Sequence, residues 1–138
     1  MMARATRPIP EGYHTITPYI VARDASAAID FYKRAFGAKE RSRSLTPDGL
    51  ILNAQLEIGD SIVMLMDESP AWGSKSPLSL GGTPVTIHLY VDDVDAAFDR
   101  ATKAGAKVTM PLGDQFWGDR YGTVADPFGH VWSIATHK

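Results

Sequence analysis

The sequence predicts an α+β fold built from two tandem modules, each with the element order βαβββ. The first observation is an internal repeat, because residues 21–39 (VARDASAAIDFYKRAFGAK) resemble residues 91–107 (VDDVDAAFDRATKAGAK). In both copies an apolar run leads to an Asp, an Ala-rich segment with helical spacing follows, and Gly-Ala-Lys comes after it. The second observation is that runs typical of three strands follow each copy. The third is that a stretch rich in Pro, Gly and Ser separates the copies.

The predicted organisation has four parts. Residues 1–12 form an N-terminal arm, 13–67 the first module, 68–84 a linker and 85–138 the second module. Two copies of one unit suggest a cavity with twofold character between them.

The first module begins with a predicted strand at 14–22 (HTITPYIVA), which is rich in β-branched and aromatic residues. Pro18 indicates an edge strand or a bulge, because proline cannot donate to a strand ladder. Asp24, which corresponds to Asp92 in the second copy, is a predicted N-cap, and Asp92 and Asp93 are both predicted caps of the second helix. The helix that follows should end at Gly37.

Three strands are predicted after this helix, at 39–45, 50–58 and 61–67, with a turn signal at Pro47-Asp48-Gly49. The middle strand alternates between apolar and polar residues, which indicates one buried and one polar face. The two sets are Leu52, Ala54, Leu56 and Ile58 on one face and Asn53, Gln55 and Glu57 on the other.

The second module repeats the pattern, with a strand at 85–91, a helix at 93–104 ended by Gly105, and strands at 107–111, 120–125 and 130–136. An ordinary ferredoxin-like sandwich also combines two helices with a sheet. Its βαβ order does not supply three strands after each helix, so we prefer the repeat. Four aromatic residues on the helices should be core: Phe31, Tyr32, Phe36 and Phe98.

The composition excludes several classes of function. The chain of 138 residues has a formal net charge of −2, so it lacks the excess of Lys and Arg that nucleic-acid binding requires. It has no cysteine, which removes disulfides and thiolate chemistry. Without a long apolar run or a signal-like N-terminus, we expect a cytoplasmic protein with no membrane partner.

Four segments resemble one known superfamily. They are TPYIVARDASAAIDFYKRAFGAKE (17–40), LYVDDVDAAFDRATKAGAKV (89–108), FWGDRYG (116–122) and DPFGHVWSIATH (126–137). They look like the PhnB-like branch of the glyoxalase/bleomycin-resistance/extradiol-dioxygenase superfamily, also called vicinal oxygen chelate proteins. The resemblance implies two βαβββ modules that curl into half-barrels around a cavity, and a homodimer. It implies no single reaction, because the superfamily includes isomerases, dioxygenases and non-catalytic antibiotic-binding proteins.

The resemblance also implies where a metal would bind. Metal-dependent members typically place two His and two Glu on the first and last strands of each module. The corresponding positions here are Thr17, Val63, Thr86 and Ser133. Because a hydroxyl is a poor ligand for a divalent ion and Val is none, we expect no four-ligand site and no cofactor. A divalent metal at a shifted, non-standard site stays possible.

Period-two alternation predicts which side chains share a face with these positions. They are Thr15, Thr17, Tyr19 and Val21; Asn53, Gln55 and Glu57; Thr86, His88 and Tyr90; and Val131, Ser133 and Ala135. This lining is polar but sparsely charged, which favours a neutral or mildly polar small molecule.

His88 is the candidate for proton transfer, because a neutral imidazole near pH 7 acts as an acid or a base. The alternative is a His that only shapes the pocket by bonding a neighbouring group. With Glu57 or Gln55 it could instead hold a shifted metal. A different His, His130, directly follows the Asp126–Gly129 turn, and we expect it to stabilise that turn.

The segment FWGDRYG is the second candidate region. Trp117 and Tyr121 offer flat apolar surfaces with polar edges, and Arg120 offers a planar fork for a carboxylate or phosphate. The alternative is a structural turn in which Asp119 pairs with Arg120 or caps the backbone, and Trp117 fills the core or a dimer interface.

The sequence therefore leaves three functions open. The first is a small-molecule-binding protein, with ligand-binding candidates Tyr19, Asn53, Gln55, Trp72, Thr86, Trp117, Arg120 and Tyr121. The second is a lyase, isomerase or dioxygenase-like enzyme with catalytic candidates His88, Tyr90 and Glu57, which could use a shifted metal. The third is a non-catalytic structural or regulatory module.

Overall fold

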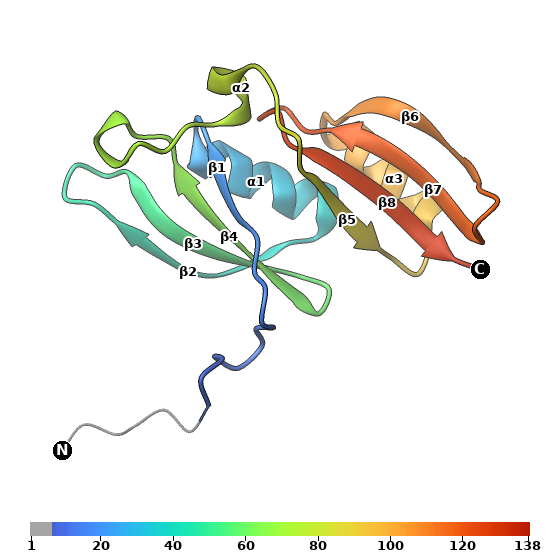
Figure 1. The fold of residues 1–138 in the computed structure, drawn as a ribbon, viewed down its shortest axis with the longest axis horizontal. Coiled ribbons are helices and arrows are strands. Elements are labelled where there is room, and N and C mark those ends of the chain that lie inside the picture. Colours follow the sequence, from blue (N-terminus) through green and yellow to red (C-terminus); the bar gives the residue numbers. More distant parts are fainter. Residues whose placement is uncertain (1–6) are drawn as a thin grey trace.

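The computed structural model describes residues 7–138 and divides them into two βαβββ modules (Figure 1). The elements of the first module are β1 (Tyr19–Ala22), α1 (Ala25–Phe36), β2 (Lys39–Leu45), β3 (Ile51–Ile58) and β4 (Ser61–Asp67). Its four strands form one sheet in the order β1-β4-β3-β2, in which β1 pairs in parallel with β4.

The second module has the same plan. Its elements are β5 (Thr86–Tyr90), α3 (Val94–Ala104), β6 (Lys107–Asp114), β7 (Asp119–Ala125) and β8 (Val131–His137). The strand order β5-β8-β7-β6 repeats that of the first sheet, with β5 and β8 parallel. The predicted α+β fold of two tandem βαβββ modules is therefore confirmed.

The linker between the modules is not a featureless loop. It contains a short 3-10 helix, η1 (Pro70–Trp72), and one turn of helix, α2 (Pro77–Leu80). The carboxylate of Glu68 accepts hydrogen bonds from the backbone and hydroxyl groups of Ser76, which precedes α2. These bonds hold the pKa of Glu68 at about 2.

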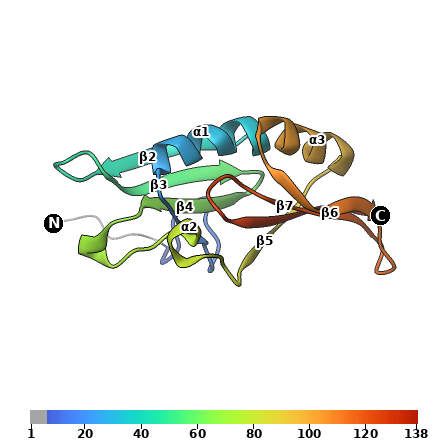
Figure 2. The same ribbon diagram turned by 90° about the horizontal axis from the view of Figure 1, so that it is seen from above.

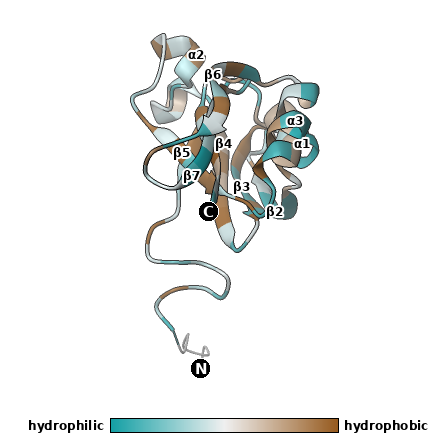
Figure 3. Cartoon of the chain, turned by 90° about the vertical axis from the view of Figure 1, so that its right-hand side faces the viewer, coloured by the Kyte–Doolittle hydropathy of each residue, from teal (hydrophilic) through white to brown (hydrophobic). Residues whose placement is uncertain are grey.

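The two long helices lie on the same side of the sheets and contact each other (Figure 2). Arg100 of α3 donates to the backbone carbonyls of Lys33 and Arg34 near the end of α1. Arg34 in turn donates to the carbonyl of Ala104 at the end of α3. Hydrophilic residues gather on parts of these helices and on β2, whose sequence is KERSRSL, whereas β4 (SIVMLMD) is mainly hydrophobic (Figure 3).

Capping fixes where the helices begin and end. Asp24 accepts the amide hydrogen of Ala27 at the start of α1, and Gly37 ends the helix with φ of 68°, a region that favours glycine. In the second module the N-cap is Asp93, not Asp92. The repeat is therefore displaced by one residue at this point, and α3 has 11 residues against 12 in α1.

A buried carboxylate joins the modules at the core. Asp126 Oδ2 accepts the hydroxyl of Tyr32 at 2.5 Å and the indole Nε1–H of Trp132 at 2.9 Å. Its Oδ1 accepts the backbone N–H groups of Phe128 and His130. Tyr32 belongs to α1 whereas the other four residues belong to the second module, so one side chain ties the two halves together.

His130 adds a second tie across the modules. Its backbone takes part in the turn, as predicted, while its ring Nε2 lies 2.8 Å from the carbonyl oxygen of Val21 on β1. The residues predicted as core are buried, including Phe31, Tyr32 and Phe98, and Phe36 is partly buried beside them.

Two strand predictions for the first module differ from the structure. The strand expected at 14–22 begins only at Tyr19, directly after Pro18. In β3, Leu52 is exposed and Ile51 is buried, because a register shift places Ser44 opposite Asn53 but Leu45 opposite Ile51. A bulge of this kind interrupts the alternation on which the prediction rested.

Two strands of the second module are longer than predicted. β6 continues to Asp114 and β7 begins at Asp119, so the two strands form a long hairpin. Residues 7–12 of the expected arm belong to no helix or strand, and the rest of the arm lies outside the described residues. Within residues 7–138, no helix is both long and apolar enough to cross a membrane.

Candidate functional site

A cavity of about 610 Å³ lies between the modules, where β1 faces β5 and the linker passes by. Its wall is mainly apolar and includes Tyr19, Val21, Leu80 and Val85. Thr86 and His88 also line it, so the structure brings together four predicted lining residues from two modules: Tyr19, Val21, Thr86 and His88.

A second cavity of about 310 Å³ lies at the other end of the same junction. Thr17, Val63, His88 and Tyr90 contribute to its wall. Thr17 and Val63 are two of the positions at which metal-dependent relatives are expected to place ligands. His88 is common to both cavities, which makes it the central polar side chain of the junction.

The ring of His88 is fixed by its neighbours. Nδ1 lies 2.6 Å from the hydroxyl oxygen of Ser133, which is 2 % exposed on β8. The ring packs edge-on against Tyr90 at 4.4 Å between centroids and nearly parallel to Tyr121 at 5.9 Å. Nε2 makes no hydrogen bond to any of residues 7–138, so it is left to interact with a ligand.

A row of aromatic side chains continues from His88 toward the β6–β7 hairpin. Tyr121 meets Trp117 edge-on at 5.5 Å, and Trp117 meets Phe116 edge-on at 5.1 Å. Trp117 is 46 % exposed and Phe116 is 97 % exposed. We call Tyr90, His88, Tyr121, Trp117 and Phe116 the aromatic row; it presents flat apolar surface beside the cavities.

Asp119 lies against this row and is only 4 % exposed. Its carboxylate accepts hydrogen bonds from His137 Nδ1 (2.7 Å), the Tyr90 hydroxyl (2.9 Å) and Trp117 Nε1 (3.2 Å). The bond from His137, assisted by the other two, holds the pKa of the Asp119 carboxyl below its usual value. The hydrogen bond from the Tyr90 hydroxyl to Asp119 raises the pKa of the Tyr90 phenol.

Sequence reasoning missed this role of Asp119. The structural alternative, in which Asp119 pairs with Arg120 or caps the backbone, is wrong about its partners. The alternation of β7 was the available signal, because it places Asp119 and Tyr121 on one face and Arg120 on the other.

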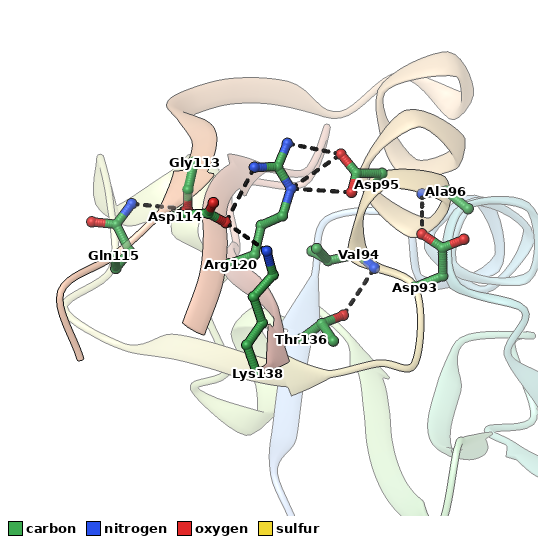
Figure 4. A network of polar contacts seen from close by, with 10 residues as sticks. All are labelled: Asp93, Val94, Asp95, Ala96, Gly113, Asp114, Gln115, Arg120, Thr136 and Lys138. Carbon is green, nitrogen blue, oxygen red and sulfur yellow. Dashed lines mark hydrogen bonds and ion pairs between the residues drawn. The ribbon is translucent and has the colours of Figure 1, made fainter. Parts of the chain in front are cut away.

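Arg120 lies on the helix side of β7, within a network of charged groups (Figure 4). Its guanidinium contacts Asp95 on α3 at 2.9 Å and Asp114 on β6 at 3.3 Å, and Lys138 also reaches Asp114. These contacts join α3 to the hairpin. The structure does not bring Arg120 together with His88 or the aromatic row.

The glycines of the same segment have two different roles. Gly118 has φ of 99°, in the region that favours glycine. Gly122 instead permits a close approach, because a Cβ there would lie 2.6 Å from the ring of Phe98 on α3.

The remaining candidates lie elsewhere. Asn53, Gln55 and Glu57 lie half-buried on β3, outside the walls of both cavities. Asn53 donates weakly to the sulfur of Met64, and no hydrogen bond or ion pair joins Glu57 to His88 among residues 7–138. Trp72 is half-buried in the linker and lines neither cavity.

Of the four positions matched to metal ligands, Thr17 and Val63 line the second cavity, Thr86 lines the first, and Ser133 bonds to His88. In the part of the chain that the structure describes, no three His, Asp or Glu side chains converge. His88 and Ser133 form a hydrogen-bonded polar pair at the junction.

Comparisons with known proteins agree with this architecture. The protein Rv0887c of Mycobacterium tuberculosis is 57% identical over 122 residues, which cover 86% of this chain and 72% of that protein. The crystal structure of TioX from Micromonospora sp. ML1 is 32% identical with a TM-score of 0.71, over 89% of this chain and 98% of TioX.

A PhnB protein from Bacillus cereus shares the fold at 18% identity, with a TM-score of 0.67 over 89% of this chain and 99% of that one. The model of the Glyoxalase/Bleomycin resistance protein/Dioxygenase superfamily matches residues 12–134, which span both modules and the linker. On this match, the chain belongs to the glyoxalase/bleomycin resistance protein/dioxygenase superfamily.

Proposed function

We propose that the protein binds a neutral or weakly polar, planar small molecule at the junction of its two modules. The observation that carries the proposal is the cavity of about 610 Å³, whose apolar wall contains the oriented ring of His88. A concave, mostly apolar site with a few placed polar groups is typical of small-molecule binding. Its volume lies within the usual range of such sites.

The chemistry of the wall supports this class of ligand. Because Nδ1 of His88 is engaged by Ser133, Nε2 remains to donate or to accept one hydrogen bond. The neighbouring aromatic row offers faces on which a planar ring system stacks favourably. The ligand that fits best is an aromatic compound with one hydrogen-bonding group, held without the four-ligand metal site of metal-dependent relatives.

The test uses 2-naphthol, which is planar and carries one hydroxyl, and 1-adamantanol, which is apolar and carries a hydroxyl but is not planar. By calorimetry at pH 7.5 we expect 2-naphthol to bind with a dissociation constant below about 1 mM. Binding of 1-adamantanol should be at least tenfold weaker. Equal affinity for the two compounds, or no binding of 2-naphthol, would contradict the proposal.

Variants separate the polar contact from the shape of the wall. His88→Phe keeps a ring against Tyr90 and Tyr121 but removes Nε2, so 2-naphthol should bind about fivefold more weakly, as for one lost hydrogen bond. His88→Ala should weaken binding further, because it also removes the ring. Lys103→Ala, on the exposed surface of α3, is the control and should leave the affinity unchanged.

A second function, proton transfer on a carbonyl compound, is favoured by one observation. The His88 ring is held by Ser133 through Nδ1, it lines both cavities, and Tyr90 lies in contact with it. A positioned imidazole of this kind serves as a general base. The enzyme should then exchange the α-protons of 2-tetralone with deuterium faster than buffer does, in a His88-dependent way.

The same assay addresses a shifted metal. The exchange is measured after treatment with EDTA and again after addition of Mn²⁺ or Zn²⁺. If exchange is no faster than in buffer alone after EDTA, with Mn²⁺ and with Zn²⁺, proton transfer is contradicted and binding remains the proposed function. Exchange that requires the metal and His88 would favour the metalloenzyme.

We also propose that the protein is a homodimer. Strands of both sheets carry large exposed apolar side chains outside the ligand site, namely Leu45 (55 %), Leu52 (44 %) and Met110 (37 %). Monomeric soluble proteins rarely leave extended apolar surfaces in water. A second copy packed against these strands removes that surface from solvent.

A further inference from the structure

We propose that Asp119 is a positioning residue of the ligand site: its carboxylate holds Tyr90 and Trp117 in the geometry that receives a planar ligand. This inference rests on the proposed binding function and extends it to a residue outside both cavity walls. It gives the buried acid of the FWGDRYG segment a role that neither charge pairing with Arg120 nor backbone capping explains.

Hydrogen-bond donors converge on the Asp119 carboxylate. The three donors to Asp119 come from three separate elements: Tyr90 from β5, Trp117 from the β6–β7 hairpin and His137 from β8. Nearby, the backbone N–H of Lys138 donates to the carbonyl of Gly118. The hairpin tip that carries Trp117 is thus fastened to β5, which carries His88, and to β8, which carries Ser133.

The side chains that Asp119 holds are themselves exposed. Tyr90 is 59 % exposed and Trp117 is 46 % exposed, so packing alone restrains each ring on only one side. A hydrogen bond from the polar edge of each ring to a carboxylate that is 4 % exposed fixes its orientation. The aromatic faces stay open while the polar edges are engaged.

Ordering Tyr90 and Trp117 in the free protein lowers the entropic cost of binding a ligand. An exposed side chain that is free to change rotamer must be immobilised when a ligand stacks on it, and this cost weakens binding by roughly 2- to 10-fold for each side chain. Because Asp119 orders Tyr90 and Trp117 before the ligand arrives, much of this cost is already met in the folded protein. Removal of the carboxylate should therefore weaken binding although Asp119 touches no cavity.

An ion pair with His137 is the competing explanation, and Asp119→Asn separates the two. The amide oxygen of Asn still accepts from Tyr90 and Trp117, and its amino group donates to Nδ1 of a neutral His137. Asp119→Ala removes every one of these bonds. If the carboxylate acts by positioning the rings, Asn substitutes for Asp; if it acts by its charge, Asn fails as Ala does.

The first measurement is the indole N–H resonance of Trp117 in ¹⁵N-labelled protein, assigned with Trp117→Phe. In the Asp119→Ala variant we expect this resonance to move upfield and broaden, while the indole resonances of Trp72 and Trp132 stay in place. Asp119→Asn should retain most of the wild-type position. Asp114→Ala, on the same hairpin but bonded to Arg120 and Lys138, is the control and should leave it unchanged.

The second measurement is the dissociation constant for 2-naphthol. Asp119→Ala should raise it by about 5- to 30-fold, whereas Asp119→Asn and Asp114→Ala should raise it less than about threefold. A wild-type constant in folded Asp119→Ala would overturn the inference, as would an Asn variant as weak as the Ala variant. If Asp119→Ala unfolds the protein, the single variants Tyr90→Phe and Asp119→Asn are compared instead. Tyr90→Phe removes the hydrogen bond to Asp119 and should weaken binding, whereas Asp119→Asn keeps that bond and should not.

The two readouts keep this inference apart from the proposed function. If the wild-type protein does not bind 2-naphthol but the Trp117 resonance responds as expected, the binding function fails and the structural role of Asp119 stands. If the wild-type protein binds and the Trp117 resonance is indifferent to Asp119→Ala, the positioning role fails and the binding function stands.

Discussion

Asp119 and Asp126 are both buried carboxylates of the second module, but they act on different partners. Asp119 collects donors from its own module beside the aromatic row, whereas Asp126 reaches Tyr32 of the first module. A hydrogen bond to a buried charged acceptor contributes more than one between neutral groups. Asp126 therefore stabilises the arrangement of the modules on which the junction cavities depend.

Tyr32→Phe tests this tie at the residue scale. We expect it to lower the free energy of unfolding by about 1.5–3 kcal/mol in urea, because Asp126 loses one donor while its other three remain. Tyr121→Phe is the matched control, since its hydroxyl bonds none of residues 7–138, and it should cost less than about 0.5 kcal/mol. A smaller effect for Tyr32 than for Tyr121 would show that the tie contributes little.

The same residue predicts a dependence on pH. Burial, and then the charge of Asp126, raise the pKa of the Tyr32 phenol well above its usual value. A group whose pKa is raised on folding stabilises the protein fully below its unfolded pKa and progressively less above it. Stability should therefore fall as the pH rises above about 10, and part of that fall should be absent in Tyr32→Phe when urea unfolding is compared at pH 8 and 10.5.

At the scale of elements, the repeat predicted the type and order of the helices and strands well. Apolar periodicity and glycine ends identify α1 and α3, because both signals are local to the helix. The helix bounds agree to within one residue, but the repeat did not distinguish Asp92 from Asp93 as the cap of α3. The cap in the second module is Asp93, since α3 is one residue shorter than α1, and a repeat aligned on Asp92 does not show the deletion.

The two adjacent aspartates give a direct comparison. Asp93→Ala should destabilise the protein by about 1 kcal/mol, because Asp93 accepts the amide hydrogen of Ala96 at the start of α3. Asp92→Ala, which removes a neighbouring charge but no cap, should change stability by less than about 0.5 kcal/mol. Thermal and urea unfolding of the two variants measure the difference, and equal losses would argue against Asp93 as the cap.

The candidate site could be predicted only in part for a physical reason. Alternation along a strand reveals which residues share a face, so Tyr19, Thr86 and His88 could be placed together before the structure was known. It does not reveal the order of the strands in a sheet, and Glu57 lies on β3, which β4 separates from β1, and lines neither cavity. Asp119 bonds Tyr90, which lies 29 positions away in the sequence, and His137, which lies 18 positions away. No local sequence pattern encodes contacts at such separations.

At the scale of the whole molecule, the two modules face one another through α1, α3 and the edge strands β1 and β5. The apolar strand residues left in water make the oligomeric state the next property to measure. Light scattering should give a mass of about 30 kDa, twice that of the 15.0 kDa chain.

A single substitution tests which surface the partner covers. Leu45→Glu should weaken the dimer by about tenfold, because it places a charge among the apolar residues that we assign to the interface. Ser44→Glu, on the adjacent exposed position, is the control for charge alone. A wild-type protein of 15.0 kDa at all concentrations would contradict the dimer, whatever the variants do.

The central claim is that a planar ligand occupies the junction at His88, and its most direct test is NMR mapping with 2-naphthol on backbone- and histidine-labelled protein. The account predicts that the His88 ring signals shift most, together with amides of β1 and β5 around Tyr19 and Val85 and those of the aromatic row near Tyr121. Shifts confined to the outer surfaces of α1 and α3, with the His88 ring unmoved at saturation, would contradict it.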